Sequence, residues 1–209
     1  MEVVTISGKA RNEIGKKEIK VVRKEGKIPG VIYGGGTTVH FSTMLNDVRP
    51  IVYTPNFKVA DIDVDGETYR CILKDVQYHP VTEAIQHLDF LRLIDGTPVK
   101  VQVPVRFTGS SPGVKEGGKL LQSVRRIKIK TTPEHLVDEL ILDISELRLG
   151  HAIRVRDIET NENIEIQSAG GTPVAVVEIP RALRSAATAA AKETKEPGAE
   201  ADAEADPAV

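Results

Sequence analysis

Residues 59–78 read VADIDVDGETYRCILKDVQY, and this stretch decides the fold. From Val59 to Val64 apolar side chains alternate with acidic ones, as they do in a strand with one buried face. Asp65-Gly66 favours the two-residue turn of a β-hairpin, so Glu67–Tyr78 should return alongside the first strand. The stretch therefore predicts an antiparallel hairpin.

Further strand-like runs flank this hairpin. They cover residues 2–10, 31–33, 39–42 and 85–93. Short helices are predicted over residues 15–26, ahead of Pro29, and near residues 45–48. Many strands and few helices favour an antiparallel meander that closes into a small barrel or half-barrel. The predicted fold class is mainly β with short helices, at the border of all-β and α+β.

A second unit is predicted after the breaker cluster Ile94–Pro98. Its strand-like runs cover residues 99–107, 125–131, 139–144, 153–156 and 173–179. We therefore divide the chain into a barrel domain over residues 1–95, a C-terminal β domain over 96–182 and a tail over 183–209. The tail is acidic and rich in Ala and Glu, and it cannot supply a core, so disorder is expected there.

Charge is unevenly spread along the chain. The 209 residues carry 28 Lys and Arg against 30 Asp and Glu, a formal net charge of −2. This balance excludes a uniformly basic nucleic-acid binder. Residues 1–40 nevertheless hold eight bases and four acids, whereas residues 182–209 hold three bases and six acids. The basic N-terminal end indicates a contact with nucleic acid at that end of the chain.

Neither disulfide nor membrane chemistry is indicated. Cys71 is the one cysteine, which excludes an internal disulfide and a multi-thiolate zinc site, and its apolar neighbours favour a buried position. The first residues show no secretory pattern, and no apolar run approaches the roughly 20 residues that span a bilayer. A cytoplasmic protein without membrane contact is therefore expected.

One face of the first predicted helix is basic. Its bases recur every three or four residues and share a stripe, formed by Lys16, Lys20, Arg23 and Lys27. Ile19 and Val22 lie on the opposite side, where they can face a core. A stripe of this kind is often only a solvated face, but Lys and Arg also bind phosphates, and Tyr33 could stack on a base. Both interpretations stay open on this pattern alone.

A second candidate site combines His87 and Asp89. Alternation puts both on one face of a strand, while Leu88 and Phe90 take the other. Catalysis would need a nucleophile at motif spacing, and a metal site would need His79 from across a turn. An exposed hydrogen-bonded pair and the recognition of base edges are the remaining interpretations.

A third pattern lies in the second unit. Residues 113–120, GVKEGGKL, match a phosphate loop at seven of eight positions. The eighth, Leu120, has no hydroxyl for Mg²⁺, and no clear helix follows to bind phosphates. A loop between strands is therefore expected there.

Two separate motifs resemble signatures of a bacterial family. The first is RNEIGKK at residues 11–17 with GKIPGVIYG at 26–34, and the second is KDVQYHP at 74–80 with HLDF at 87–90. In order and spacing they resemble the 5S-rRNA-binding large-subunit ribosomal protein family numbered twenty-five, in its long two-domain form, that of the general stress protein CTC. The second unit is also similar, for example over residues 137–147.

The resemblance implies a six-stranded antiparallel barrel with helices and a C-terminal β domain. It implies a non-enzymatic structural protein, without catalytic residue, metal or cofactor, that binds the loop E region of 5S rRNA in the central protuberance of the large subunit. The positions that resemble the family's RNA contacts are Arg11, Lys16, Lys20, Arg23, Tyr33, Gln77, His87 and Asp89. The predicted helix departs from the family pattern at Lys17, Glu18, Ile19 and Val21.

Two other expectations concern partners and rival functions. The second unit should contact neighbouring ribosomal protein or rRNA, because it holds a cluster of bases: Lys119, Arg125, Arg126, Lys128 and Lys130. The alternative function is a stress-related RNA-binding regulator acting off the ribosome, which would not sediment with large subunits. An enzyme built on His87 and Asp89 would require a pocket around them.

Overall fold

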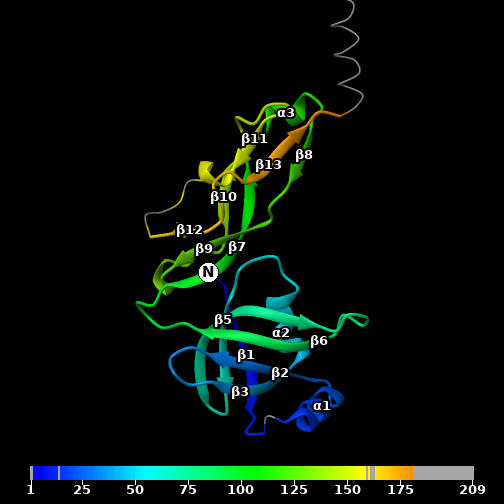
Figure 1. Cartoon of the computed structure of the whole chain (residues 1–209), viewed down its shortest axis with the longest axis vertical. Coiled ribbons are helices and arrows are strands. Elements are labelled where there is room, and N and C mark those ends of the chain that lie inside the picture. Colours follow the sequence, from blue (N-terminus) through cyan, green and yellow to red (C-terminus); the bar gives the residue numbers. More distant parts are fainter. Residues whose placement is uncertain (1, 14, 159, 161–162, 181–209) are drawn as a thin grey trace, which may run out of the picture.

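The structure is a computed structural model that describes residues 2–13, 15–158, 160 and 163–180. The molecule is elongated, with the first six strands at one end and the later strands at the other (Figure 1). The predicted tail over residues 183–209 lies outside the described residues. Among the residues that are described, no helix is long and apolar enough to cross a membrane.

The first six strands close into a barrel in the order β1-β3-β2-β6-β5-β4. The strands are β1 (Val3–Ala10), β2 (Lys27–Tyr33), β3 (Val39–Met44), β4 (Val59–Val64), β5 (Glu67–Tyr78) and β6 (Ile85–Arg92). Two helices accompany them, α1 (Lys16–Lys24) and α2 (Leu45–Val52). The prediction of a mainly β protein with a six-stranded barrel is therefore confirmed.

The prediction that all strand pairs of this barrel are antiparallel is wrong for two of them. β1 pairs with β4 in parallel, and β2 pairs with β6 in parallel. In each case several elements lie between the partners in the chain, which allows the long crossover that parallel pairing requires. Alternation along a strand reports which side chains are buried, but it does not report which strand lies alongside or in which direction it runs.

The hairpin of β4 and β5 is confirmed. The two strands are antiparallel, with Val64 opposite Glu67. Both turn residues have positive φ, 52° at Asp65 and 96° at Gly66, as the favoured two-residue hairpin turn requires. The Asp63 carboxylate accepts a hydrogen bond from the Gly66 N–H at 2.9 Å, which helps to hold this turn.

Phe41 lies at the centre of the barrel core. Its ring packs against that of Phe90, with centroids 5.9 Å apart, and both side chains are fully buried. A Cβ on Gly30 would come within 2.7 Å of the Phe41 ring, so only glycine allows β2 to approach it this closely. Cys71 belongs to the same apolar cluster and is buried, as its sequence context predicted.

Two open sheets make up the second unit. One has the order β10-β7-β9-β12 and the other the order β11-β13-β8. Their strands are β7 (Val99–Thr108), β8 (Lys119–Gln122), β9 (Arg126–Thr131), β10 (Leu140–Asp143), β11 (Ala152–Arg154), β12 (Glu165–Ile166) and β13 (Pro173–Glu178). Helix α3 (Pro112–Lys115) and 3₁₀ turns at Pro133–His135 and Val155–Asp157 complete it. β8 and β12 were not predicted.

The loop that resembles a phosphate loop contains α3 and continues directly into β8. A strand, rather than a helix, therefore begins at Lys119, so no helix N-terminus lies there to receive phosphates. The prediction of a connection between strands is confirmed, with the addition of one short helix.

The barrel and the second unit share an apolar cluster. Val59 of β4 and Ile72 of β5 face away from the barrel interior and belong to the same buried cluster as Val101 and Ile129 of the second unit. The Lys74 ammonium group also donates a hydrogen bond to the Lys100 carbonyl at 2.9 Å. These contacts fasten β5 to β7.

Candidate nucleic-acid interface

The outer face of β2, β6 and β5 carries four of the predicted site residues. In β6, Leu88 and Phe90 are buried in the barrel, so His87 and Asp89 point outward. Gln77 of β5 lies directly opposite His87. Tyr33 ends β2, the strand that pairs with β6 on its other side. We call these residues, Tyr33, Gln77, His87 and Asp89, the reading face.

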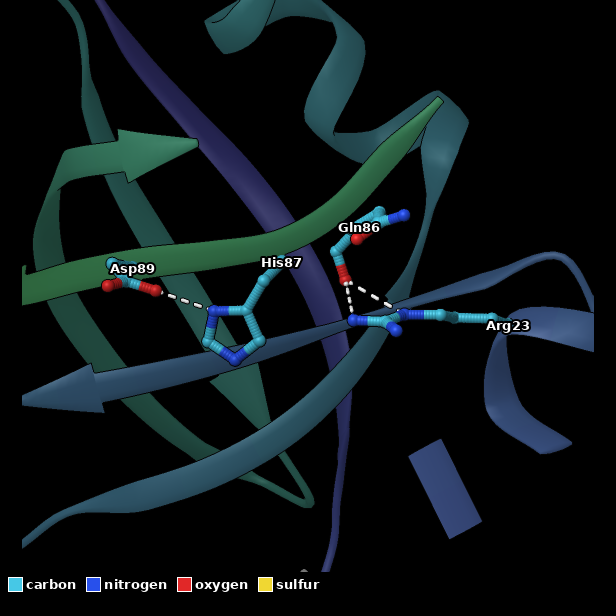
Figure 2. Close-up of polar contacts among 4 residues, drawn as sticks. All are labelled: Arg23, Gln86, His87 and Asp89. Atoms are coloured by element: carbon cyan, nitrogen blue, oxygen red, sulfur yellow. Dashed lines mark hydrogen bonds and ion pairs between the residues drawn. The ribbon is translucent and has the colours of Figure 1, made fainter. Parts of the chain in front are cut away.

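His87 and Asp89 form a hydrogen-bonded pair on this face. Nδ1 of His87 lies 2.6 Å from Oδ1 of Asp89, and about a quarter of each side chain is exposed (Figure 2). A carboxylate only accepts hydrogen bonds, so Nδ1 is the donor and Nε2 is directed away from Asp89. The pair therefore fixes the imidazole orientation while leaving a ring nitrogen and a second carboxylate oxygen for a ligand.

Asp75 is a further member of this surface that the sequence reasoning missed. It lies directly opposite Asp89 in the β5–β6 pairing. Register shifts interrupt that pairing between Leu73 and Asp75 and again after Gln77, and no sequence motif marks these shifts. Two carboxylates opposite each other destabilise a sheet, so this arrangement suits a ligand with hydrogen-bond donors better than it suits stability.

The acidic neighbours also act on Tyr33. Burial is the largest cause that raises the pKa of Tyr33 above its usual value of 10.0, and the charges of Asp89 and then Asp75 raise it further. The hydroxyl therefore remains protonated at neutral pH. Tyr33 can accordingly donate a hydrogen bond as well as present its ring to a base.

Helix α1 supplies three of the four residues of the predicted basic stripe; the prediction is wrong for Lys27, because the helix ends at Lys24 and Lys27 begins β2. Lys16, Lys20 and Arg23 are all exposed, while Ile19 and Val22 on the opposite side are half-buried, as the spacing predicted. The Arg23 guanidinium donates from Nε and Nη2 to the Gln86 carbonyl, at 3.2 and 2.9 Å (Figure 2). Gln86 precedes His87, so Arg23 joins the helix to the strand that carries the reading face.

Arg11 lies outside this group. Its backbone N–H donates to the His40 carbonyl at 2.9 Å, and its guanidinium donates to the Glu13 carbonyl at 3.2 Å. These bonds hold it in the connection between β1 and α1. The bonds described for Arg11 do not join it to the reading face.

His79, considered as a possible metal ligand, has a structural role in the β5–β6 turn. Its Nδ1 accepts hydrogen bonds from the N–H groups of Val81 and Thr82, at 3.3 and 3.2 Å. No group of three or more His, Cys, Asp or Glu side chains in the described part of the chain could hold a metal ion.

An enzyme built on His87 and Asp89 would require a pocket around these two residues. Two clefts, of about 340 and 1560 Å³, are lined by residues other than His87 and Asp89.

The fold and this surface define a class of protein: a β-barrel protein with a polar sheet face and a basic helix suited to nucleic acid. The model of the Ribosomal L25p family matches residues 6–90. The model of the ribosomal protein TL5 C-terminal domain matches residues 98–181. Together the two matches span both β units.

Relatives extend the similarity to nearly the whole chain. A protein of Cytophaga hutchinsonii named "Large ribosomal subunit protein bL25" is 41% identical over 192 residues, covering 92% of this chain and 100% of the relative. Proteins of the same name from Amoebophilus asiaticus and Porphyromonas gingivalis are 38% and 40% identical. Their alignments cover 91% and 90% of this chain, and 96% and 98% of the relatives.

The chain therefore belongs to the ribosomal L25p family, in the long form that carries a TL5-type C-terminal domain. The resemblance drawn from the two motifs is confirmed. Because this is a family of structural ribosomal proteins, the expectation that the chain is not an enzyme is confirmed as well.

Proposed function

We propose that this protein is a structural component of the large ribosomal subunit that binds 5S rRNA. Its reading face and α1 contact the loop E region in the central protuberance, and it acts in the cytoplasm on the ribosome. The relatives' name supports the assignment to the large subunit. The 5S rRNA partner and the loop E region follow from the resemblance and from the chemistry of the surface.

The observation that carries the proposal is the fixed His87–Asp89 pair beside a basic helix. A carboxylate repels phosphates, so its place on an RNA-binding surface is explained by hydrogen bonds from base amino or imino groups. The major groove of A-form RNA is deep and narrow, whereas its minor groove is wide and shallow, and the outer face of a barrel can approach the shallow groove. Non-canonical pairs expose additional base edges to such a face.

The two parts of the surface have different roles. Lys16 and Lys20 supply attraction to phosphates that does not depend on sequence, as does Arg11 from the connection before the helix. Tyr33, Gln77, His87 and Asp89 contact bases and sugars. Arg23 has a double role, because its guanidinium already binds the Gln86 carbonyl and still lies exposed at the edge of α1.

The test is a titration of the full chain with purified 5S rRNA. The matched control is a 5S rRNA in which the non-canonical pairs of loop E are replaced by Watson–Crick pairs. We expect the control to bind at least about tenfold more weakly, because base-edge contacts are each worth about 1–3 kcal/mol. Equal affinity for the two RNAs would contradict the proposal.

Sedimentation separates the proposed function from the regulatory alternative. A ribosomal protein should migrate with large subunits in stoichiometric amounts and remain there at moderate salt. Migration in RNA complexes separate from the subunits would favour a regulator acting off the ribosome.

A further inference from the structure

A cleft of about 340 Å³ lies at the junction of the barrel and the second unit. It borders the surface of the reading face at Asp75, but none of the four reading-face residues lines it. Its walls include Lys74 and Tyr78 from β5, and Val101 and Ile72 contribute to its apolar lining. Lys100 and Gln102 of β7 and Arg126 of β9 complete its polar side. The three strands come from different parts of the chain, so the cleft exists only in the folded protein.

Positive charge accumulates on the sheet face beside this cleft. Antiparallel pairing of β7 and β9 puts Lys100 opposite Lys130 and Gln102 opposite Lys128, while Val101 and Ile129 point into the core. Like charges opposite each other cost stability, so a negatively charged ligand would relieve the repulsion here.

Acidic side chains neutralise only part of this face. Glu165 pairs with Lys130 at 3.0 Å, and Glu139 pairs with Arg106 at 3.1 Å. No ion pair among the described residues involves Lys100, Arg126 or Lys128. Within the cleft, Lys58 is paired with Glu2 at 2.9 Å, and Asp75 is the acidic residue of the lining.

Two exposed tyrosines add aromatic surface at this place. Tyr78 is 46% exposed at the end of β5, and Tyr53 is 57% exposed directly after α2. Burial and then Tyr53 raise the pKa of Tyr78, and Arg126 lowers it, so these three groups lie close enough to interact. Exposed aromatic rings beside Lys and Arg side chains that form no ion pair are typical of surfaces that bind single-stranded nucleic acid.

We propose that the junction cleft binds an unpaired RNA nucleotide, with its base stacked on Tyr78 and its flanking phosphates held by Arg126 and Lys100. The volume lies at the lower end of the range for small-ligand pockets, which suits a single base. The cations together with the exposed Tyr78 ring favour RNA over an acidic protein segment, because RNA supplies both phosphates and a base that can stack. The cleft is lined by none of the four reading-face residues, and the proposal does not depend on the proposed contact with 5S rRNA.

The test measures binding of the full chain to a fluorescent oligouridylate at low salt. Tyr78→Ala should weaken binding about tenfold, within the range for loss of one stacked base, and Tyr78→Phe should retain it. Arg126→Glu should weaken binding and also flatten its salt dependence. The matched control is Lys115→Glu in α3, which makes the same charge change outside the cleft and should bind nearly as the parent chain does.

Two results would overturn the proposal. One is equal weakening by Arg126→Glu and Lys115→Glu with no effect of Tyr78→Ala, which would show diffuse attraction rather than a site. The other concerns a photo-crosslinking benzophenone at position 53 of the full chain in large subunits. We expect an adduct with rRNA, and an adduct only with protein would contradict an RNA ligand.

Discussion

Helix α1 and the reading face belong to one candidate surface, but the fold holds them in different ways. Helix α1 has no buried residue and no side-chain cap at Gly15, and it depends on the half-buried Ile19 and Val22 and on Arg23. The reading face lies on a closed barrel whose inner side is filled by Leu88 and Phe90. The helix is therefore suited to contributing positive charge, and the sheet to contributing fixed geometry.

The largest effect should come from removing the core under the sheet. Phe41→Ala should lower the free energy of unfolding by about 3–5 kcal/mol, because it leaves a large cavity against Phe90 and Gly30. The matched change in the helix, Val21→Ala at a 53% exposed position, should cost less than about 0.5 kcal/mol. Urea unfolding measures both free energies. A similar loss in the two variants would contradict the view that the sheet is held by its core and the helix is not.

Cys71 provides a second readout of the same prediction. Burial raises the pKa of its thiol to about 12, so at pH 8 the reactive thiolate forms only when the barrel opens. Labelling by a thiol reagent should be slow in the parent chain and in Val21→Ala. It should be markedly faster in Phe41→Ala.

The next largest effect should come from the reading face itself. Asp89→Asn keeps the shape but replaces one acceptor oxygen by a donor, so affinity for 5S rRNA should fall by about 1.5–3 kcal/mol. The slope of log K against log salt should barely change, since an acid neutralises no phosphate. Tighter binding by Asp89→Asn, as relief of repulsion would produce, would remove Asp89 from the recognition residues.

Arg23→Ala tests how the helix is attached to the sheet. Loss of the bonds to the Gln86 carbonyl should reduce the local stability of α1 by about 1 kcal/mol. Amide hydrogen exchange in α1 should then become roughly fivefold faster. Lys20→Ala, on the same stripe, is the control and should leave exchange unchanged. Equal exchange in both variants would show that Arg23 does not hold the helix.

A smaller effect on RNA affinity is expected from Lys20→Ala. A side chain that contacts one phosphate should flatten the salt dependence of 5S rRNA binding by roughly one unit or less. The affinity of Lys20→Ala and of Asp89→Asn is measured at several salt concentrations. The two slopes distinguish a residue that contacts phosphate from one that recognises a base. A slope equal to that of the parent chain would place Lys20 outside the interface.

The smallest effect should come from removing residues 184–209. This segment is acidic, so phosphates repel it, and its loss should leave 5S rRNA affinity unchanged or slightly improved at low salt. A large loss of affinity would mean that the segment takes part in binding.

Local chemistry explains what could be predicted from the amino-acid sequence. The Asp65-Gly66 turn, the buried Cys71 and the outward direction of His87 and Asp89 all follow from neighbours within a few residues. Dihedral preferences and alternation along a strand act over that range. The family resemblance also rests on short motifs, so it needed no tertiary information.

Only the tertiary structure decided which distant segments meet. It set the parallel pairs β1–β4 and β2–β6, and it brought Asp75 opposite Asp89 through register shifts. It covered the outward-facing Val59 with the second unit and brought Tyr78 beside Arg126. The physical reason is that barrel closure and the burial of apolar surface at the junction are properties of the whole chain, and the pattern within a single strand does not encode its neighbour.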